Sequence, residues 1–314
     1  MILITGGAGF IGYHLTHELL KNKNNVIVID NFDPYYDENI KKNNLNELSD
    51  YKNFLFIKED ITDVQSLKKI FKKYSFQIVY HLAARPGVRP SFINPYIYDQ
   101  INVQGTYKLL YVCNLFNVRK IIFASSSSVY GKNSIPFKED QYPLHPLSVY
   151  GCSKLNAEEV CKFFCRRYGF QIWIFRLFSI YGPKLRPDLA MYKFTKAILE
   201  DKEILLYNFG KYKRDFTYIT NIIEILIKSK NSFPDTYEIV NLGNSQPLSI
   251  KNLVTLLEQK LNKKAKIKLI KNPYYENPIT YASIEKVKKI FGYTAFYPID
   301  KGLDNFLRWF LNKK

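Results

Sequence analysis

The glycine-rich loop near the start of the chain constrains the fold more than any other sequence feature. Gly6, Gly9 and Gly12 are spaced three residues apart, between a short apolar run, Ile2–Thr5, and a helical pattern over Ile11–Lys21. Glycines at this spacing let the backbone approach a pyrophosphate group at the amino end of a helix. The simpler alternative is a tight turn between a strand and a helix. Because both flanking elements are present, the spacing favours a dinucleotide-binding loop.

Short apolar strands alternate with helical patterns through the first half of the chain, which is typical of a parallel sheet. The predicted strands are Ile2–Thr5, Val26–Asp30, Phe54–Lys58, Ile78–Leu82, Ile121–Ser125 and Gln171–Leu177. Long helices are predicted over Tyr96–Phe116 and Tyr150–Tyr168. We therefore expect an α/β fold, with a Rossmann-type doubly wound parallel sheet over residues 1–178. A smaller C-terminal α/β substrate-binding domain is expected over residues 179–314, with segments near 215–242 returning to the first sheet.

A tyrosine and a lysine four residues apart stand far downstream of the glycine loop. Tyr150 and Lys154 fall on one face of a predicted helix, one turn apart. An ammonium group at that distance favours the phenolate, so the pKa of the tyrosine is expected to fall. Such a tyrosine can take a proton from an alcohol while a hydride leaves the same carbon. The alternative is a helix surface pair, but the dinucleotide loop upstream favours catalysis.

Acidic residues follow the second and third predicted strands. Asp30 ends the second strand, where a carboxylate accepts hydrogen bonds from ribose hydroxyls and repels a 2′-phosphate. This position predicts NAD rather than NADP. Asp60 and Ile61 follow the third strand and are expected to flank the adenine. For Asp60, a helix cap is the alternative.

The composition raises the question of a nucleic-acid partner. The formal net charge is +18 and the isoelectric point is about 9.5. The lysines are scattered, however, and no basic run is interleaved with aromatic residues. We therefore expect anionic small molecules as partners and no nucleic acid.

The four cysteines and the hydropathy bear on metals and location. Cys113, Cys152, Cys161 and Cys165 include no matched pair of Cys-x-x-Cys motifs, so we expect no metal site and a reducing, cytoplasmic environment. The first predicted strand starts at Met1, which is expected to leave no room for a signal peptide. No apolar run approaches the roughly 20 residues of a membrane span, so no membrane partner is expected.

The motifs together carry a family resemblance that runs nearly end to end. They are Thr5–Gly12, His81–Arg89, Asn102–Thr106, Ser125–Gly131, Tyr150–Lys154, Arg176–Pro183, Arg186–Asp188 and Arg214–Tyr218. On these residues the chain resembles the extended short-chain dehydrogenases/reductases. Within that superfamily it is similar to the nucleotide-sugar 4-epimerases, with the UDP-glucuronate 4-epimerases as the most similar subfamily.

The resemblance implies a role for each matching residue. Tyr150 is implied as the base, Lys154 as the residue that holds the nicotinamide ribose, and Ser126 as the hydroxyl that bonds the 4-oxygen of the sugar. The implied NAD contacts are Gly6, Gly9, Phe10, Ile11, Gly12, Asp30, Asn31, Asp60, Ile61, Leu82, Ala83, Ala84, Asn102, Tyr150 and Lys154. The implied substrate contacts are Arg89, Ser127, Ser128, Ser179, Arg186, Arg214 and Glu276.

The two residues after Ser126 separate the reactions within this superfamily. The sugar 4,6-dehydratases of this superfamily carry Asp-Glu at these two positions, and the UDP-glucuronate decarboxylases carry Glu at the second. This chain has Ser127 and Ser128. Without a carboxylate at these two positions, the chain has no residue to move protons at carbons beyond the 4-position. A redox step at the 4-position that reverses itself is therefore favoured. The alternative is a serine-rich turn without a role in selectivity.

Four arginines are candidates for binding anionic groups of the substrate: Arg85, Arg89, Arg186 and Arg214. By the resemblance, Arg214 matches the ligand of the diphosphate, and Arg186 matches the residue that holds the sugar carboxylate. A planar guanidinium suits a carboxylate better than an ammonium does. For any one of them, a surface salt bridge is the alternative.

Two other positions bear on the sugar that is bound. Ser179 stands where neutral-sugar epimerases often have asparagine, which favours a glucuronate. The family's Pro-Gly-Asp reads Tyr274-Tyr275-Glu276 here, and Glu276 is expected to replace the aspartate.

These expectations combine into a UDP-hexuronate 4-epimerase with tightly held NAD, assembled as a homodimer. The alternatives are a 4-epimerase of a neutral UDP-hexose or UDP-N-acetylhexosamine, and a catalytically silent NAD-binding regulator. The intact Tyr150, Lys154 and Ser126 argue against the regulator.

Overall fold

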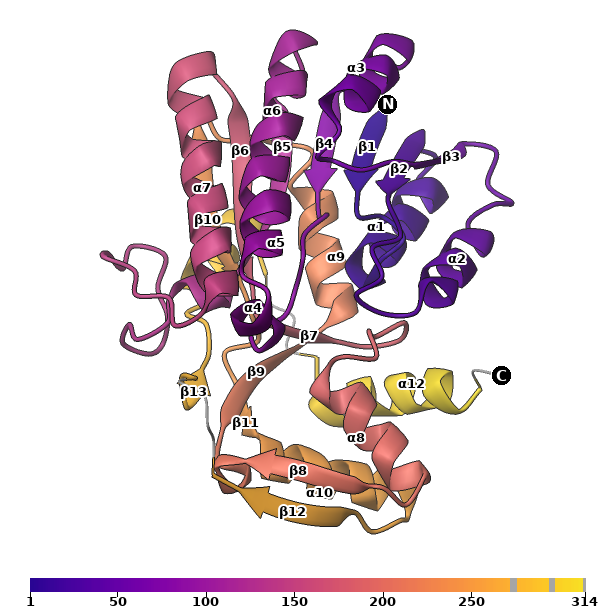
Figure 1. Ribbon diagram of the computed structural model, residues 1–314, viewed down its shortest axis with the longest axis vertical. Coiled ribbons are helices and arrows are strands. Elements are labelled where there is room, and N and C mark those ends of the chain that lie inside the picture. The colour runs from indigo at the N-terminus through magenta and orange to yellow at the C-terminus, as the bar shows by residue number, and fades with distance from the viewer. Residues whose placement is uncertain (272–275, 294–296, 313–314) are drawn as a thin grey trace. The chain divides into compact units, whose positions relative to one another are not determined.

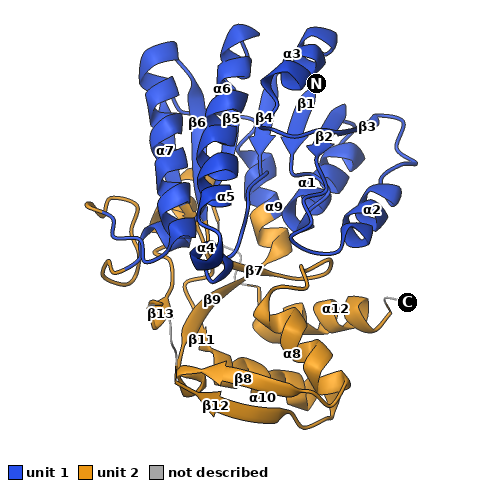
Figure 2. Cartoon of the chain, in the orientation of Figure 1, with its two compact units in different colours: residues 1–131, 144–176, 223–240 blue, residues 132–143, 177–222, 241–314 orange. Residues whose placement is uncertain are grey.

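The computed structural model describes residues 1–271, 276–293 and 297–312. The chain divides into two compact units, shown in different colours in Figure 2. Unit 1 comprises Met1–Gly131, Leu144–Arg176 and Ile223–Val240. Unit 2 comprises Lys132–Pro143, Leu177–Ile222 and Asn241–Lys314.

A seven-stranded, mostly parallel sheet forms the centre of unit 1. Its strands are β1 (Ile2–Thr5), β2 (Val26–Asp30), β3 (Phe54–Lys58), β4 (Ile78–His81), β5 (Lys120–Ser126), β6 (Gln171–Leu177) and β10 (Tyr237–Leu242). Their order across the sheet is β10-β6-β5-β4-β1-β2-β3. Every residue of β1 and β2 is buried, because helices cover both faces. The predicted Rossmann-type α/β class is confirmed, and the predicted bounds of the first three strands and the sixth are those observed.

Helices lie on both faces of this sheet. They are α1 (Phe10–Lys21), α2 (Glu38–Asn46), α3 (Val64–Lys73), α4 (Pro90–Ile93), α5 (Tyr96–Tyr98), α6 (Gly105–Leu115), α7 (Val149–Tyr168) and α9 (Ile219–Lys228). In Figure 1, α3, α6 and α7 lie in front of the sheet, and α1 and α9 lie behind it. Leucines, isoleucines and phenylalanines from the front helices pack on β1, β2, β4 and β5 in one buried cluster. Behind the sheet, the Tyr80 hydroxyl of β4 donates to the Leu226 carbonyl of α9 at 2.9 Å.

The helix predicted over Tyr96–Phe116 contains a π-helical turn. Residues Asp99–Gln104 form this turn between α5 and α6. A π turn adds one residue to the helical path and occurs often at functional sites. Hydrophobic periodicity alone did not reveal it, because the apolar pattern continues on both sides.

Unit 2 contains smaller sheets and its own helices. Its elements are β7 (Ser179–Tyr181), α8 (Ala190–Leu199), β8 (Glu203–Tyr207), β9 (Lys213–Tyr218), β11 (Pro247–Ser249), α10 (Ile250–Leu261), β12 (Lys266–Ile270), β13 (Ile279–Thr280), α11 (Glu285–Phe291) and α12 (Ile299–Leu311). Strand β9 pairs with β7, β11 and β13. Strands β8 and β12 form a separate parallel pair. The Asp215 carboxylate of β9 is buried and accepts hydrogen bonds from the backbone N–H groups of Asn244, Ser245 and Ala282.

Within the described residues, no helix has the length and apolar character that a membrane crossing requires. All four cysteines are free thiols, with Cys152 exposed and the other three buried.

Candidate active site

The glycine loop connects β1 directly to the amino end of α1. The Gly6 N–H donates to the Ile29 carbonyl at 2.7 Å, and the Gly9 N–H donates back to the Gly6 carbonyl at 3.2 Å. Helix α1 has Gly9 at its N-cap with no side-chain cap, and Phe10 and Ile11 open its first turn. A Cβ atom on Gly12 would lie 2.4 Å from the Gly6 carbonyl oxygen, so only glycine allows the loop to close this tightly. The arrangement fits a pyrophosphate at the start of the helix.

Asp30 lies at the carboxyl end of β2, beside this loop. Its Oδ2 accepts a hydrogen bond from the Ala8 N–H at 3.2 Å, and its Oδ1 accepts one from the Phe32 N–H at 2.9 Å. Burial raises the pKa of Asp30, and the Lys41 ammonium, 3.8 Å from Oδ1, opposes that rise. The carboxylate stands where a ribose is expected, and its buried negative charge disfavours a phosphate there.

Asn31 and Asp60 contact each other at the ends of β2 and β3. The Asn31 amide donates to Asp60 Oδ2 at 2.7 Å, and Asp60 Oδ1 accepts from the Thr62 N–H at 2.7 Å. The N-cap of α3 is Asp63, so Asp60 is not the cap of this helix. Ile61 is buried next to this pair.

The loops that follow β2 and β4 are joined by an ion pair that the sequence did not predict. The Arg85 guanidinium bonds the Asp33 carboxylate and lies over the ring of Tyr35, 4.8 Å from its centroid. Strand β1 lies between β2 and β4, so these two loops flank the glycine loop from either side. Arg85 is therefore paired within unit 1.

Asn102, in the π-helical turn, fixes the loop after β4 and the start of α7. Its side chain accepts from the Arg85 N–H at 2.7 Å and donates to Ser153 Oγ at 2.9 Å. Ser153 Oγ in turn donates to the Tyr150 carbonyl at 2.8 Å. In the same loop, the N–H groups of Leu82 and Ala83 donate to Thr5, and Ala84 precedes Arg85. The structure thus brings the β4 loop, Asn102 and the first turn of α7 together.

Tyr150 and Lys154 lie near the amino end of α7, which Ser148 caps by accepting from the Gly151 N–H at 3.0 Å. Lys154 is only 3% exposed, and its Nζ lies 4.4 Å from the centroid of the Phe123 ring of β5. Burial lowers the pKa of Lys154 to about 8, while the neighbouring Cys161 and Glu158 oppose the change. The rings of Tyr150 and Tyr98 meet edge to face, with centroids 6.2 Å apart.

Ser126 ends β5, and Ser127 and Ser128 form the short 3-10 turn that follows it. The Ser126 hydroxyl oxygen accepts from the Ser128 N–H at 3.1 Å. A Cβ atom on Gly151 would lie 2.6 Å from the Ser128 carbonyl oxygen, so glycine at this position allows the serine turn to approach α7 closely. The three serines and Tyr150 therefore belong to adjoining backbone segments at the carboxyl end of the sheet.

His81, the last residue of β4, belongs to this region although sequence reasoning gave it no role. Its ring nitrogens lie 2.8 Å from Thr5 Oγ1 and 3.0 Å from Thr106 Oγ1. Burial, with the nearby Lys154 charge, lowers the pKa of His81 to about 3, so the ring is neutral. The hydroxyl of Thr106 donates to the Asn102 carbonyl at 2.6 Å, so it accepts from the histidine. A polar residue at the end of an otherwise apolar strand was the available signal.

The remaining predicted substrate residues lie in unit 2, apart from Arg89, which precedes α4 in unit 1. Arg186 Nε and Nη2 each donate to the Asp188 carboxylate at 2.9 Å. Burial alone would raise the pKa of Asp188, but this pairing holds it below its ordinary value. One edge of the Arg186 guanidinium is therefore occupied by Asp188, which fixes its plane.

Arg214 and Glu276, both predicted substrate residues, form an ion pair at 3.1 Å. Arg214 also donates to the Asn277 carbonyl at 3.1 Å. Ser179 begins β7, paired with Phe216 of β9. Tyr274 and Tyr275 lie outside the described residues.

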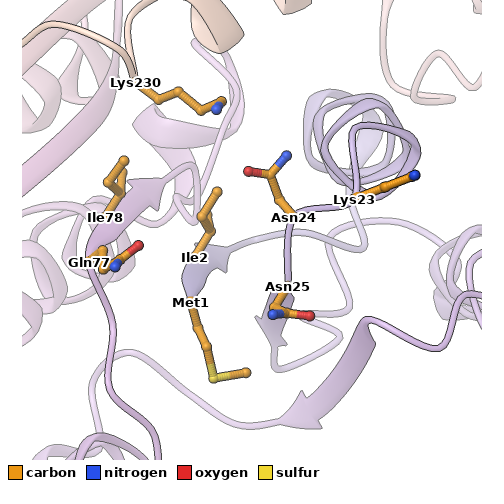
Figure 3. A pocket seen from close by; sticks show the side chains of 8 residues that line it. All are labelled: Met1, Ile2, Lys23, Asn24, Asn25, Gln77, Ile78 and Lys230. Atoms are coloured by element: carbon orange, nitrogen blue, oxygen red, sulfur yellow. The ribbon is translucent and has the colours of Figure 1, made fainter.

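Two other features of the described residues do not add to this site. No three His, Cys, Asp or Glu side chains among them gather as a metal site requires. A cavity of about 280 Å³ lies at the amino ends of β1 and β4, lined by Ile2, Ile78 and polar side chains that include Lys23, Asn24 and Lys230 (Figure 3). It is at the end of the sheet opposite the glycine loop.

Most of the residues that form this site lie within a segment that matches a known protein family. The model of the NAD dependent epimerase/dehydratase family matches residues 2–243. The chain belongs to this family. The match covers the glycine loop, the serine turn and the Tyr150–Lys154 pair, all of which lie in that range.

Relatives within the family cover the whole chain. A UDP-glucuronate 4-epimerase of Thermodesulfobacterium geofontis is 41% identical over 98% of this chain and 95% of its own length. The crystal structure of a UDP-glucuronic acid 4-epimerase from Bacillus cereus, in complex with UDP-glucuronic acid and NAD, is 34% identical with a TM-score of 0.94, and covers 100% of this chain and 99% of its own. A UDP-N-acetylglucosamine 4-epimerase from Methanobrevibacter ruminantium is 30% identical with a TM-score of 0.88, over 100% of this chain and 98% of its own.

The tight closure of the glycine loop leads to a first prediction, which concerns how strongly the protein retains NAD. Gly12→Ala places a methyl group against the Gly6 carbonyl, and the resulting strain is expected to weaken NAD binding by roughly 5- to 150-fold, for about 1–3 kcal/mol of overpacking. The NAD released by denaturing the purified variant, quantified by chromatography, should fall well below that of the unmodified protein.

Gly169→Ala is the matched control. Gly169 also lies in unit 1, at φ +67°, with no atom within 4 Å of an added Cβ. This variant should lose about 1–2 kcal/mol of stability from backbone strain but keep its NAD. Full NAD content in Gly12→Ala would contradict the assignment of this loop.

Proposed function

We propose that the protein is a UDP-glucuronate 4-epimerase, which interconverts UDP-glucuronate and UDP-galacturonate through a 4-keto sugar. The observation that carries the proposal is the similarity to 4-epimerases of this substrate along the whole chain, together with hydroxyl side chains at positions 127 and 128. A dehydratase or decarboxylase of the extended short-chain dehydrogenase/reductase superfamily would need a carboxylate at position 127 or 128. The chemistry therefore stays at the 4-position.

Residues of this chain fit NAD at the carboxyl end of the sheet. The cradle at Gly12 has no room for a side chain, and Asp30 presents a carboxylate that suits ribose hydroxyls and disfavours a 2′-phosphate. Bound NAD would supply the hydride acceptor and donor for the carbon that bears the 4-hydroxyl group. Because the cofactor is regenerated in every turnover, it has no need to leave.

Tyr150 is proposed as the base that takes the proton from the 4-hydroxyl group and later returns it. Lys154 holds a positive charge one turn away, which favours the phenolate. Ser126 is proposed to bond the 4-oxygen and hold it toward Tyr150. Ser127 and Ser128 can bond the sugar but cannot remove a proton from C5.

The arginines of unit 2 are proposed as the anion ligands. Arg186 is assigned to the sugar carboxylate and Arg214 to the diphosphate, with Arg89 of unit 1 and Ser179 as further substrate contacts. Asp188 holds the Arg186 guanidinium through two hydrogen bonds, and Glu276 forms an ion pair with Arg214. The 4-keto form of a uronate is a β-keto acid that loses CO₂ easily. An arginine that holds the sugar carboxylate in one orientation would help to protect the intermediate from this loss.

A 4-epimerase of a UDP-N-acetylhexosamine is the alternative that a specific observation favours. A solved enzyme of that kind is 30% identical to this chain. The two proposals differ in whether the preferred sugar carries a carboxylate, which an assay with both substrates decides.

A homodimer through α6 and α7 is proposed from their exposed faces. Tyr107, Tyr111 and Leu115 are spaced by one turn along α6 and are exposed, as is Phe163 of α7. An apolar patch of this kind on two neighbouring helices is typical of an interface. A cytoplasmic location stays a prediction.

The role of Tyr150 gives a second prediction. Tyr150→Phe removes the acidic hydroxyl but keeps the ring, so folding and bound NAD should persist. The rate of conversion of UDP-glucuronate, followed by separating the two UDP-uronates, should fall about 10² -fold or more. Near-normal turnover would place the base elsewhere.

The third prediction concerns the sugar carboxylate. If Arg186 binds it, Arg186→Leu should lower kcat/KM for UDP-glucuronate by roughly 10- to 100-fold, since a charge-assisted contact contributes about 1.5–3 kcal/mol. UDP-glucose, which lacks the carboxylate, serves as the control and should change little. The ratio of the two efficiencies is the quantity to compare.

If both efficiencies fall together, Arg186 is structural or binds the diphosphate. If the unmodified protein already prefers UDP-N-acetylglucosamine, the glucuronate assignment is wrong and the alternative stands.

The fourth prediction tests the assembly. The protein should have the mass of a dimer by light scattering at micromolar concentration. Leu115→Arg, which puts a charge in the exposed apolar face of α6, should shift it toward the 37.0 kDa monomer. A monomeric unmodified protein would rule out the proposed interface.

A further inference from the structure

A fully buried ion pair lies beneath the catalytic residues of α7. Glu158 and Arg176 are 0% and 2% exposed, and Arg176 Nε and Nη2 donate to the two carboxylate oxygens at 3.0 and 2.8 Å. Ser125 Oγ donates to Glu158 Oε1 at 2.5 Å. The Arg176 guanidinium lies 4.7 Å from the centroid of the Tyr130 ring. These contacts join α7 to β5 and to β6 within unit 1.

Stability alone does not account for such a pair. Removing two charges from water costs as much as, or more than, their attraction returns, and well-packed apolar side chains often do better in the same space. The same helix and strands contribute apolar residues to the core, among them Cys161 of α7, Phe123 of β5 and Ile174 of β6. The pair therefore calls for a role that apolar residues cannot fill.

The positions of the partners point to that role. Tyr150, Lys154 and Glu158 follow one another at intervals of one helical turn, so all three fall on the same side of α7. Ser125, the partner on β5, immediately precedes Ser126. The hydrogen bond from Ser125 to Glu158 thus fixes the helix that carries the base against the strand end that carries the substrate hydroxyl.

Glu158 also supplies the negative charge one turn from Lys154. The other titratable groups around Lys154 are Tyr150 and Cys161 on α7 and His81 on β4, while Arg176 on β6 is held by Glu158 itself. His81 is neutral, and burial raises the pKa of Cys161 well above its ordinary value, so that thiol is protonated. Glu158, which Arg176 holds through two hydrogen bonds, is the one carboxylate named among these groups.

We propose that Glu158 is a positioning residue for the reaction, which holds α7 in register with the end of β5 and keeps the Lys154 ammonium charged beside Tyr150. The inference rests on the proposed roles of Tyr150 and Lys154.

The fifth prediction separates the charge of Glu158 from its shape. Burial already brings the pKa of Lys154 to about 8, so kcat/KM should fall as the pH rises through that value. Glu158→Gln removes the nearby anion and disfavours the charged lysine, so Lys154 should lose its proton at lower pH. The alkaline limb of the profile should move down by about one pH unit, and activity at pH 8 should fall about fivefold.

Ser125→Ala is the matched control, because it removes the hydrogen bond and leaves the charge. It should lower kcat about 3- to 10-fold, the size of effect expected for one lost hydrogen bond, with the alkaline limb unmoved. All rates are referred to bound NAD, so a loss of cofactor is not read as a loss of positioning.

Glu158→Gln leaves Arg176 buried without its carboxylate and can fail to fold. The double variant Glu158→Gln/Arg176→Met removes both charges at similar volume and is expected to fold. Its alkaline limb should move in the same direction.

An alkaline limb at the position of the unmodified protein in both Glu158 variants would overturn the inference, as would full kcat in Ser125→Ala. An unmodified protein that does not convert UDP-glucuronate would contradict the proposed function instead, so the two failures are distinguishable.

Discussion

The burial of the Lys154 ammonium group is a constraint that the carboxyl end of the unit 1 sheet has to satisfy. Lys154 lies inside the protein, where a positive charge is costly unless its surroundings compensate for it. The Phe123 ring presents its face to the ammonium, and Glu158 provides an anion one turn further along the same helix. Together with burial, the charge of this group also lowers the pKa of His81 at the end of β4.

The arrangement also explains why neutral polar groups dominate the rest of the region. His81 is neutral, and its bonds to the threonine hydroxyls on either side give the chain of hydrogen bonds a fixed direction toward Asn102. Asn102 then bonds the loop after β4 and Ser153. A charged histidine would repel Lys154 across a short distance, so the low pKa of His81 and the positive charge of Lys154 support one another.

Much of the fold and the chemistry could be predicted because local patterns carry them. The apolar runs of β1, β2, β3 and β6 gave their bounds, and the glycine spacing gave the loop. The spacing of Tyr150 and Lys154 gave one helix face. The sequence did not reveal the pairing of Arg85 with Asp33, or of Arg176 with Glu158, because these partners are far apart in the chain and meet only through the order of the strands. The occupied edge of Arg186 was equally hidden, since no periodicity distinguishes an arginine paired with Asp188 from one that awaits a ligand.

The π-helical turn at Asp99–Gln104 has a consequence for how this segment tolerates change in length. Each residue of an α-helix turns the chain by about 100°, so the extra residue sets the phase between α5 and α6. In the present phase, Tyr98 reaches the Pro86 carbonyl and Asn102 reaches Arg85, while Leu109, Leu110 and Cys113 of α6 pack in the core. Deleting one residue here would rotate one half of the segment against the other, and the polar contacts and the apolar face could no longer be satisfied together. Insertions and deletions in this stretch are therefore constrained more tightly than substitutions, even at positions whose side chains face water.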